Sequence, residues 1–278
     1  MLESSHRTTL PQRNKVADCL EALWFLLFPD HRPSDRDFLK GASAERLPEI
    51  EVSCRRELTL QIQRALAGVD DGPGRADSLA GEFMAKLPVI KQKLLQDARA
   101  AYERDPAASG VDEIILTYPG YLALMTYRLA HELSRSGVPL IPRMMTEYAH
   151  SLTGCDIHPD ARIGEALFID HATGVVIGQT AVIGDRVTIY QGVTLGSLSV
   201  KNRGDAKQRH PTIEDDVVLY SNATILGGET VIGARSVIGG SSWITYFVPP
   251  DSRVILAKPQ TITTKTQKPI QYIPNWDI

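Results

Sequence analysis

An aliphatic residue recurs about every six positions in the stretch ARIGEALFIDHATGVVIGQTAVIGDRVTIYQGVTLG (residues 161–196) and beyond it on both sides. The full series is Ile157, Ile163, Ile169, Ile177, Ile183, Ile189, Leu195, Ile213, Leu219, Ile225, Ile232, Ile238 and Ile244. An α-helix repeats every 3.6 residues and a strand alternates every two, so neither produces this period. The repeat architecture that does is the hexapeptide parallel β-helix.

The geometry of such a repeat explains the pattern. Each hexad supplies one short strand and one turn, and three hexads close a triangular coil of about 18 residues whose aliphatic side chains stack inside. Glycine often follows the aliphatic residue, at Gly164, Gly178, Gly184, Gly196, Gly233 and Gly239. We expect these glycines at the corners, where they tolerate unusual backbone angles. The repeat predicts a β-helix over residues 151–256.

Upstream of the repeat, the apolar spacing is helical. One predicted face carries Val16, Leu20, Leu23 and Leu27, and the best-marked helix runs from about residue 120 to 136 before Gly137 and Pro139. Residues 70–74 (DDGPG) predict a turn between helices. The fold class is therefore α+β in several parts: an all-α domain over 1–150, a left-handed parallel β-helix over 151–256, and an extended tail over 257–278.

Composition places the chain among globular proteins and excludes some partners. Of its 278 residues, 43% are hydrophobic and 23% charged, and the formal net charge is −3, so no basic surface favours nucleic acid or a membrane. The longest N-terminal apolar run, residues 22–28, is too short to span a bilayer. The three cysteines fit no metal or disulfide pattern, which favours a reducing, cytoplasmic compartment.

Histidine and aspartate in the repeat are candidates for acid–base chemistry. Asp156 and His171 lie 15 residues apart, slightly under one 18-residue coil, so we expect them near each other on adjacent coils. A carboxylate beside an imidazole makes a general base. The polar, basic segment 197–210 interrupts the hexads and predicts a projecting loop, from which His210 returns to the coil.

Several motifs in this region resemble the serine O-acetyltransferase family. They are DIHP (156–159), DHATGVVIGQTAVIG (170–184), QGVTLG (191–196), RHPTIEDDVVLYSNATILGG (209–228) and VPP (248–250). The resemblance covers residues 154–256 and extends to ERDPAA (103–108) and GYLALMTYRLAHEL (120–133). It implies acetyl transfer from acetyl-CoA to the hydroxyl of L-serine, the first step of cysteine biosynthesis from serine.

The resemblance also implies roles for single residues. His171 would be the general base, paired with Asp156, and would act without an acyl-enzyme intermediate. His210, oriented by Asp170, would be the second histidine of the site. Arg209 would bind the serine carboxylate, and Asp105 of a neighbouring subunit would meet its ammonium group.

The family binds acetyl-CoA in a groove between adjacent β-helices, which implies a homotrimer or a hexamer and no metal. The contacts carried over are Gly196, Ser221, Asn222, Ala223, Gly240, Ser241 and, as a candidate, Lys258. The terminal Ile278 would insert into O-acetylserine sulfhydrylase as a partner. Two segments depart from the family pattern: the longer loop 197–208, with Gln208 before Arg209, and LAKPQ at 256–260.

Three other functions remain open at the level of the residues. One is a hexapeptide acetyltransferase with another small acceptor, such as a sugar, an antibiotic or homoserine. Another is a γ-carbonic-anhydrase-like enzyme, in which His158, His171 and His210 would bind zinc. The third is a non-catalytic scaffold that only binds the sulfhydrylase.

Overall fold

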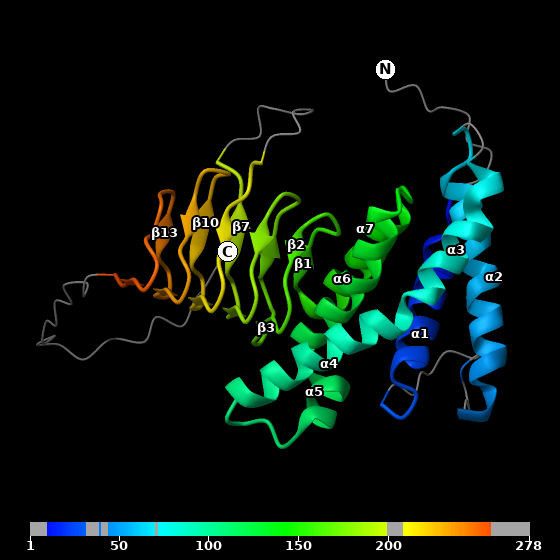
Figure 1. Ribbon diagram of the computed structural model, residues 1–278, viewed down its shortest axis with the longest axis horizontal. Coiled ribbons are helices and arrows are strands. Elements are labelled where there is room, and N and C mark those ends of the chain that lie inside the picture. Colours follow the sequence, from blue (N-terminus) through cyan, green and yellow to red (C-terminus); the bar gives the residue numbers. More distant parts are fainter. Residues whose placement is uncertain (1–9, 32–38, 40–43, 70–71, 199–207, 257–278) are drawn as a thin grey trace, which may run out of the picture.

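The computed structural model describes residues 10–31, 39, 44–69, 72–198 and 208–256, in which a helical part caps one end of a β-helix (Figure 1). The tail over 257–278, with Lys258 and Ile278, and most of the loop 197–208 lie outside the described residues. No helix among those described has both the length and the hydropathy needed to cross a bilayer.

The helical part contains seven α-helices among the described residues. They are α1 (Arg13–Leu27), α2 (Leu47–Ala65), α3 (Ala76–Ala85), α4 (Leu87–Arg104), α5 (Val111–Thr117), α6 (Pro119–Arg135) and α7 (Ile141–Thr153). The face predicted for residues 16–27 is buried in α1, and the helix predicted over 120–136 is α6. These helices share one core, because their apolar faces are buried against each other.

Helix α7 is absent from the sequence-based prediction. The spacing of Ile141, Met145 and Ala149, all buried, is the signal that identifies it. The helix ends at Thr153, where Gly154 adopts a left-handed φ of 71° and stops it. Strand β1 begins two residues after Gly154, so the boundary between the helical part and the β-helix falls at about residue 154 rather than 150.

The β-helix is built from three parallel sheets, one on each side of the triangle. The first sheet, here called face A, contains β1 (Asp156–Ile157), β4 (Val176–Ile177), β7 (Thr194–Gly196), β10 (Thr224–Leu226) and β13 (Trp243–Ile244). Face B contains β2 (Arg162–Ile163), β5 (Val182–Ile183), β8 (Thr212–Ile213) and β11 (Val231–Ile232). Face C contains β3 (Phe168–Ile169), β6 (Thr188–Ile189), β9 (Val218–Leu219), β12 (Val237–Ile238) and β14 (Arg253–Val254).

The strand register confirms the predicted stacking of hexad aliphatics. On face A, Ile157 pairs with Ile177 and Ile177 with Leu195, and the same holds on the other faces. These side chains are buried in one continuous column. Burial of apolar area in this column stabilises the stack, since no coil can bury its aliphatics alone.

The hexad glycines have a different role from the one expected. Gly164, Gly178 and Gly184 do not adopt a left-handed φ, which falls mostly on non-glycine residues of the turns such as Arg186. A Cβ atom at Gly164 would lie 2.3 Å from the Asp185 carboxylate, and one at Gly184 would lie 2.3 Å from that of Asp215. Glycine is therefore required because the next coil approaches closely.

The first coil is longer than the next one on face A. Asp156 pairs with Val176, 20 residues on, whereas Val176 pairs with Thr194, 18 residues on. The extra residues lie in the turn between β3 and β4, where His171 and Ala172 both have left-handed φ angles of 59° and 62°. The side chain of His171 is 68% exposed in this extended turn.

A buried ion pair fastens the helices to the first coil. Arg128 of α6 donates from Nε to Asp97 Oδ2 of α4 at 2.6 Å and from Nη2 to Asp97 Oδ1 at 2.8 Å. The same guanidinium donates to Gly164 O at 2.7 Å, and Asp97 accepts from Leu167 N at 3.0 Å. Both side chains are almost fully buried, so each needs the other to compensate its charge.

This junction generates a stability prediction. Asp97→Asn keeps the shape but leaves the guanidinium unpaired, and it should lower the free energy of unfolding by about 3–5 kcal/mol. Asp77→Asn is the matched control, since it breaks the exposed pair with Arg55 and should cost about 1 kcal/mol or less. Urea unfolding followed by circular dichroism measures both. Equal losses in the two variants would contradict a structural role for the junction.

Candidate active site

One group of candidate residues gathers at the corner between face C and face A. The extended turn after β3 carries Asp170 and His171, whose Oδ1 and Nδ1 atoms lie 3.4 Å apart. Asp105 follows the last residue of α4, and its Oδ2 accepts a hydrogen bond from the Tyr118 hydroxyl at 2.5 Å. Asp105, Tyr118, Asp170 and His171 are called the His171 group below.

Charges within the His171 group act on one another. The hydrogen bond from Tyr118 holds the pKa of Asp105 below its ordinary value, and His171 lowers it further. Burial raises the pKa of Asp170, while the neighbouring His171 opposes that rise. Burial and the bond to Asp105 also raise the pKa of Tyr118, so this phenol stays a hydrogen-bond donor. The carboxylates of the group can therefore bind a positively charged substrate group, and the imidazole of His171 can accept and return a proton.

A second group lies at the corner between face A and face B, where Thr180 positions His210. The Thr180 backbone N–H donates to His210 Nδ1 at 3.2 Å, and the hydroxyl lies 2.8 Å from the same atom. That hydroxyl accepts the backbone N–H groups of Arg209 and His210 at 2.8 and 3.1 Å. His210 Nδ1 is thus an acceptor, which assigns the proton of the neutral ring to Nε2.

Burial keeps His210 neutral. Desolvation, the charge of Arg209 and the nearby His158 together hold the pKa of His210 below its ordinary value. The ring packs closely against Gly178, where a Cβ atom would lie 2.0 Å from Cδ2 of His210. At neutral pH this histidine is a hydrogen-bond donor through Nε2 rather than a cation.

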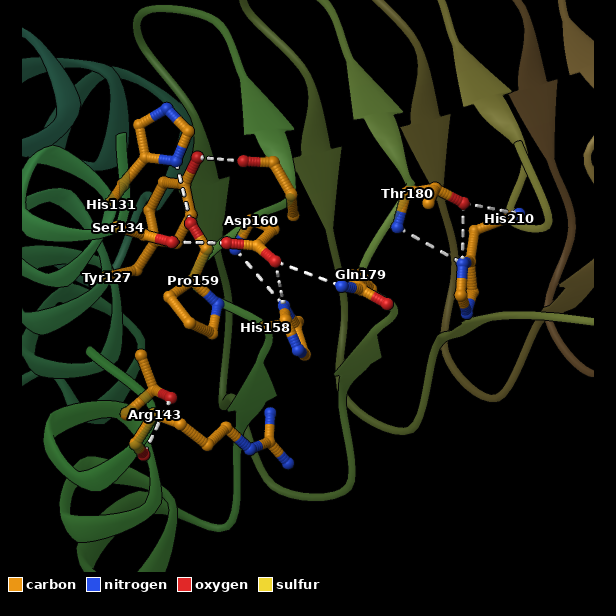
Figure 2. A network of polar contacts seen from close by, with 12 residues as sticks. Tyr127, His131, Ser134, Arg143, His158, Pro159, Asp160, Gln179, Thr180 and His210 are labelled. Atoms are coloured by element: carbon orange, nitrogen blue, oxygen red, sulfur yellow. Dashed lines mark hydrogen bonds and ion pairs between the residues drawn. The ribbon is translucent and has the colours of Figure 1, made fainter. Parts of the chain in front are cut away.

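His158 and Arg209 complete the second group, called the His210 group together with Gln179, Thr180 and His210. Figure 2 shows this side of the molecule, with His158 and Gln179 beside Asp160 and with Thr180 against His210. Arg209 donates from Nη2 to Gln179 Oε1 at 2.7 Å. Its Nε is buried and has no hydrogen-bond partner among the described residues.

The pairing expected between Asp156 and His171 is wrong for a single chain. Asp156 Oδ1 lies 3.3 Å from Nη1 of Arg143 on α7, and the Asp156 charge favours the protonated form of His158. His171 pairs instead with Asp170. The position that follows Asp156 by one coil is Val176, five residues past His171, so Asp156 and His171 do not stack directly on each other.

Two further expectations do not hold within a single chain. Asp170 does not contact His210 of the same chain, because it lies beside His171 at the other corner and Thr180 holds the His210 ring. Asp105 does not need a neighbouring subunit to approach His171, because α4 packs on β3 of the same chain and brings its end to that turn.

The residues expected to bind acetyl-CoA divide between the two corners. Ser221, Asn222 and Ala223 form the turn between faces C and A, two coils beyond His171. Gly240 and Ser241 lie one coil further, and Ser241 N donates to Ser221 O at 2.9 Å. Gly196 ends β7 and therefore lies at the corner of the His210 group.

A three-histidine metal site does not form within the described part of one chain, because His171 lies at a different corner from His158 and His210. The one group of suitable ligands there is Glu147, His150 and Asp156. Arg143 already forms ion pairs with Glu147 and Asp156, so a guanidinium supplies positive charge to that group.

No motif in the sequence marks Tyr118, Gln179 or Thr180 as residues of the site. Gln179 and Thr180 contact residues about 30 positions away across the 197–210 loop, a separation that no local pattern reports. Tyr118 contacts Asp105 across 13 residues. The extended turn at His171 was visible in advance, since Ile169 and Ile177 are spaced by eight residues instead of six.

Comparison with protein families gives a match to the model described as "Serine acetyltransferase, N-terminal", over residues 55–126. A curated relative is the plasmid-encoded serine acetyltransferase of Synechococcus elongatus, which is 43% identical over 268 residues. That alignment covers 90% of this chain and 82% of the relative.

Solved structures give the same result. Serine acetyltransferase isoform 3 of Entamoeba histolytica, in complex with cysteine, aligns with a TM-score of 0.77 and 37% identity, over 89% of this chain and 84% of that one. Soybean serine acetyltransferase, complexed with serine, aligns with a TM-score of 0.58 and 32% identity, over 85% and 96% of the two chains.

The contact between His210 and Gly178 generates a prediction about titration. Gly178→Ala should displace the ring toward solvent, because its Cβ would otherwise overlap Cδ2 and Nε2, and the pKa of His210 should rise toward about 6.5. Histidine-labelled NMR measures the titration. Gly110→Ala is the control, since a Cβ there meets nothing within 4 Å. An unchanged His210 titration in Gly178→Ala would contradict the assigned packing.

Proposed function

The chain belongs to the serine acetyltransferase family, and on that premise we propose how its residues perform the reaction. Members of this family are acetyl-CoA-dependent O-acetyltransferases, and the activity is transfer of the acetyl group to the hydroxyl of L-serine. O-acetyl-L-serine and CoA are the products, and the step begins cysteine biosynthesis from serine. The observation that carries the residue assignment is the exposed His171 beside two carboxylates.

The proposed chemistry is direct transfer with His171 as general base. His171 takes the proton of the serine hydroxyl while that oxygen attacks the thioester carbonyl carbon of acetyl-CoA. The tetrahedral intermediate then collapses, the carbon–sulfur bond breaks, and His171 returns the proton to the leaving CoA sulfur. Asp170, 3.4 Å from the imidazole, stabilises the imidazolium form.

Two charged residues fit the zwitterionic acceptor. Asp105 presents a carboxylate to the serine ammonium group, and its lowered pKa keeps it ionised. Arg209 presents a guanidinium to the serine carboxylate. A planar guanidinium can donate two parallel hydrogen bonds to one carboxylate. The buried, unpartnered Nε of Arg209 supports this role, since a buried donor without an acceptor is costly.

The two groups would meet across a boundary between chains. Face A separates the corner of His171 from the corner of His210, so one chain carries two different halves of a site. In a closed trimer, each chain would offer its His171 group to one neighbour and its His210 group to the other. Asp156, which lies near His158, would reach the His171 of another chain in the same way. A hexamer would join two such trimers.

Acetyl-CoA would lie along the groove between those chains. The corner that holds His171 continues over the next coils of the β-helix. The residues there that would contact acetyl-CoA, at increasing distance from the base, are Ser221, Asn222, Ala223, Gly240 and Ser241. Gly196 would face them from the neighbouring chain. Lys258 is outside the described residues and stays a candidate contact.

The mechanism assigns no step to a metal. A reducing, cytoplasmic setting is supported by Cys19, Cys54 and Cys155, which are free and buried. Ile278 is outside the described residues, so its insertion into O-acetylserine sulfhydrylase stays a prediction.

The base assignment is tested by a thiol-release assay with acetyl-CoA and a panel of acceptors: serine, homoserine and sugars. The wild-type protein should turn over serine alone. His171→Ala should lower kcat with serine by about 10²- to 10⁴-fold, the usual contribution of a positioned base. Arg55→Ala, which removes only the exposed ion pair of α2 with Asp77, should leave kcat unchanged. Full activity in His171→Ala would overturn the mechanism.

The acceptor contacts are tested by the Michaelis constants of the two substrates. Arg209→Ala and Asp105→Ala should each raise the KM for serine by about 10- to 100-fold, as expected for loss of a charge-assisted hydrogen bond of 1.5–3 kcal/mol. The KM for acetyl-CoA should change less than about 2-fold. An unchanged serine KM in either variant would remove that residue from the acceptor site.

A further inference from the structure

We propose that Gln179 is a positioning residue, which holds the guanidinium of Arg209 and ties it through Asp160 to helix α6. The inference rests on the proposed function, in which Arg209 binds the serine carboxylate. It adds to that function a mechanical link between the helical part and the substrate-binding arginine, built from contacts within one chain.

The contact between Gln179 and Arg209 orients one edge of the guanidinium. Gln179 lies in the turn between β4 and β5, and Arg209 lies where the chain re-enters the β-helix before β8. The bond from Arg209 Nη2 to Gln179 Oε1 is 2.7 Å long. A free arginine side chain populates many rotamers, so one that is already held in place loses less conformational entropy when it binds substrate.

The other end of the Gln179 amide is anchored in turn. Gln179 Nε2 donates to Asp160 Oδ2 at 3.0 Å, and the hydroxyl of Ser134 on α6 donates to Asp160 Oδ1. Figure 2 shows this chain running from Ser134 through Asp160 to Gln179. His158 Nδ1 accepts the Asp160 backbone N–H at 3.1 Å, which orients the turn that carries the carboxylate.

The charge of Asp160 determines which group can stand at position 179. Burial disfavours that charge, but the bonds from Ser134 and Gln179 outweigh it and hold the pKa of Asp160 below its ordinary value. A residue between this carboxylate and a guanidinium must donate on one side and accept on the other. A primary amide does both, whereas a carboxylate can only accept and an aliphatic side chain can do neither.

The same contacts explain why the amide is oriented as it is. Its N–H₂ must face Asp160 and its oxygen must face Arg209, since the reverse arrangement would put two acceptors and two donors together. Gln179 therefore transmits the position of α6 to Arg209 without itself contacting substrate.

The experiment compares serine and acetyl-CoA kinetics in three variants and the wild type. Gln179→Leu should raise the serine KM by about 3- to 30-fold and leave kcat and the acetyl-CoA KM within about 2-fold. Gln179→Glu keeps the acceptor for Arg209 but places a second carboxylate beside Asp160, so its serine KM should fall between those of Gln179→Leu and the wild type. Gln92→Leu, an exposed substitution of the same kind on α4, is the matched control and should match the wild type.

A double-mutant cycle distinguishes action through Arg209 from general damage. If Gln179 acts only by holding Arg209, the Gln179→Leu/Arg209→Ala variant should have the same serine KM as Arg209→Ala. A further increase in the double variant would overturn the inference. Should Gln179→Leu fail to fold, Asp160→Asn tests the same series of hydrogen bonds. It should raise the serine KM by a smaller factor, and an unchanged serine KM would count against the inference.

The outcomes separate this inference from the function on which it rests. A raised serine KM in Arg209→Ala with a normal one in Gln179→Leu would overturn the positioning role and leave the proposed function intact. A normal serine KM in Arg209→Ala would overturn both.

Discussion

The buried ion pair between Asp97 and Arg128 is the contact on which the geometry of the site depends. It joins α4 to α6 and binds both to the first coil through Gly164 O and Leu167 N. Asp105 follows the end of α4 and Tyr118 precedes α6, so the helices that this pair holds are the ones that bring a carboxylate and a phenol to the turn of His171. A charge pair this deeply buried adds specificity at some cost in solvation, and here it would specify how the helical part sits on the β-helix.

The triangular coil imposes the second constraint. Its strands are two or three residues long, and each strand runs from one corner of the triangle to the next. Side chains at two different corners are therefore separated by the length of a strand. His171 and His210 lie at two such corners, and no rotamer change brings them together. In the proposed trimer the chain would therefore present complementary halves to two neighbours. Polar contacts that run from α6 through Asp160 and Gln179 give the second half the same anchorage to the helices that the ion pair gives the first.

Much of the fold could be predicted from the sequence, because the hexad period is local and each aliphatic marks one strand. The site was harder to predict, because contacts between coils depend on the length of each coil. Asp156 stacks on Val176 rather than on a residue beside His171, and the eight-residue spacing from Ile169 to Ile177 is the sequence signal of the longer first coil. Thr180 could not have been paired with His210 from any pattern, since the 197–210 loop lies between them. The glycines were located correctly but explained wrongly: they make room for the next coil.

The central claim is that a working site needs the His171 group of one chain and the His210 group of another. Mixing two inactive variants tests it most directly: His171→Ala and His210→Ala, unfolded together and refolded at equal concentration, with separately refolded samples as controls. Random assembly into closed trimers would rebuild about a quarter of the sites, because half of the chains keep each histidine. We predict that acetyl transfer to serine recovers to about that fraction of the wild-type rate. Activity that stays at the level of the separate variants, despite proven exchange of chains, would contradict the account.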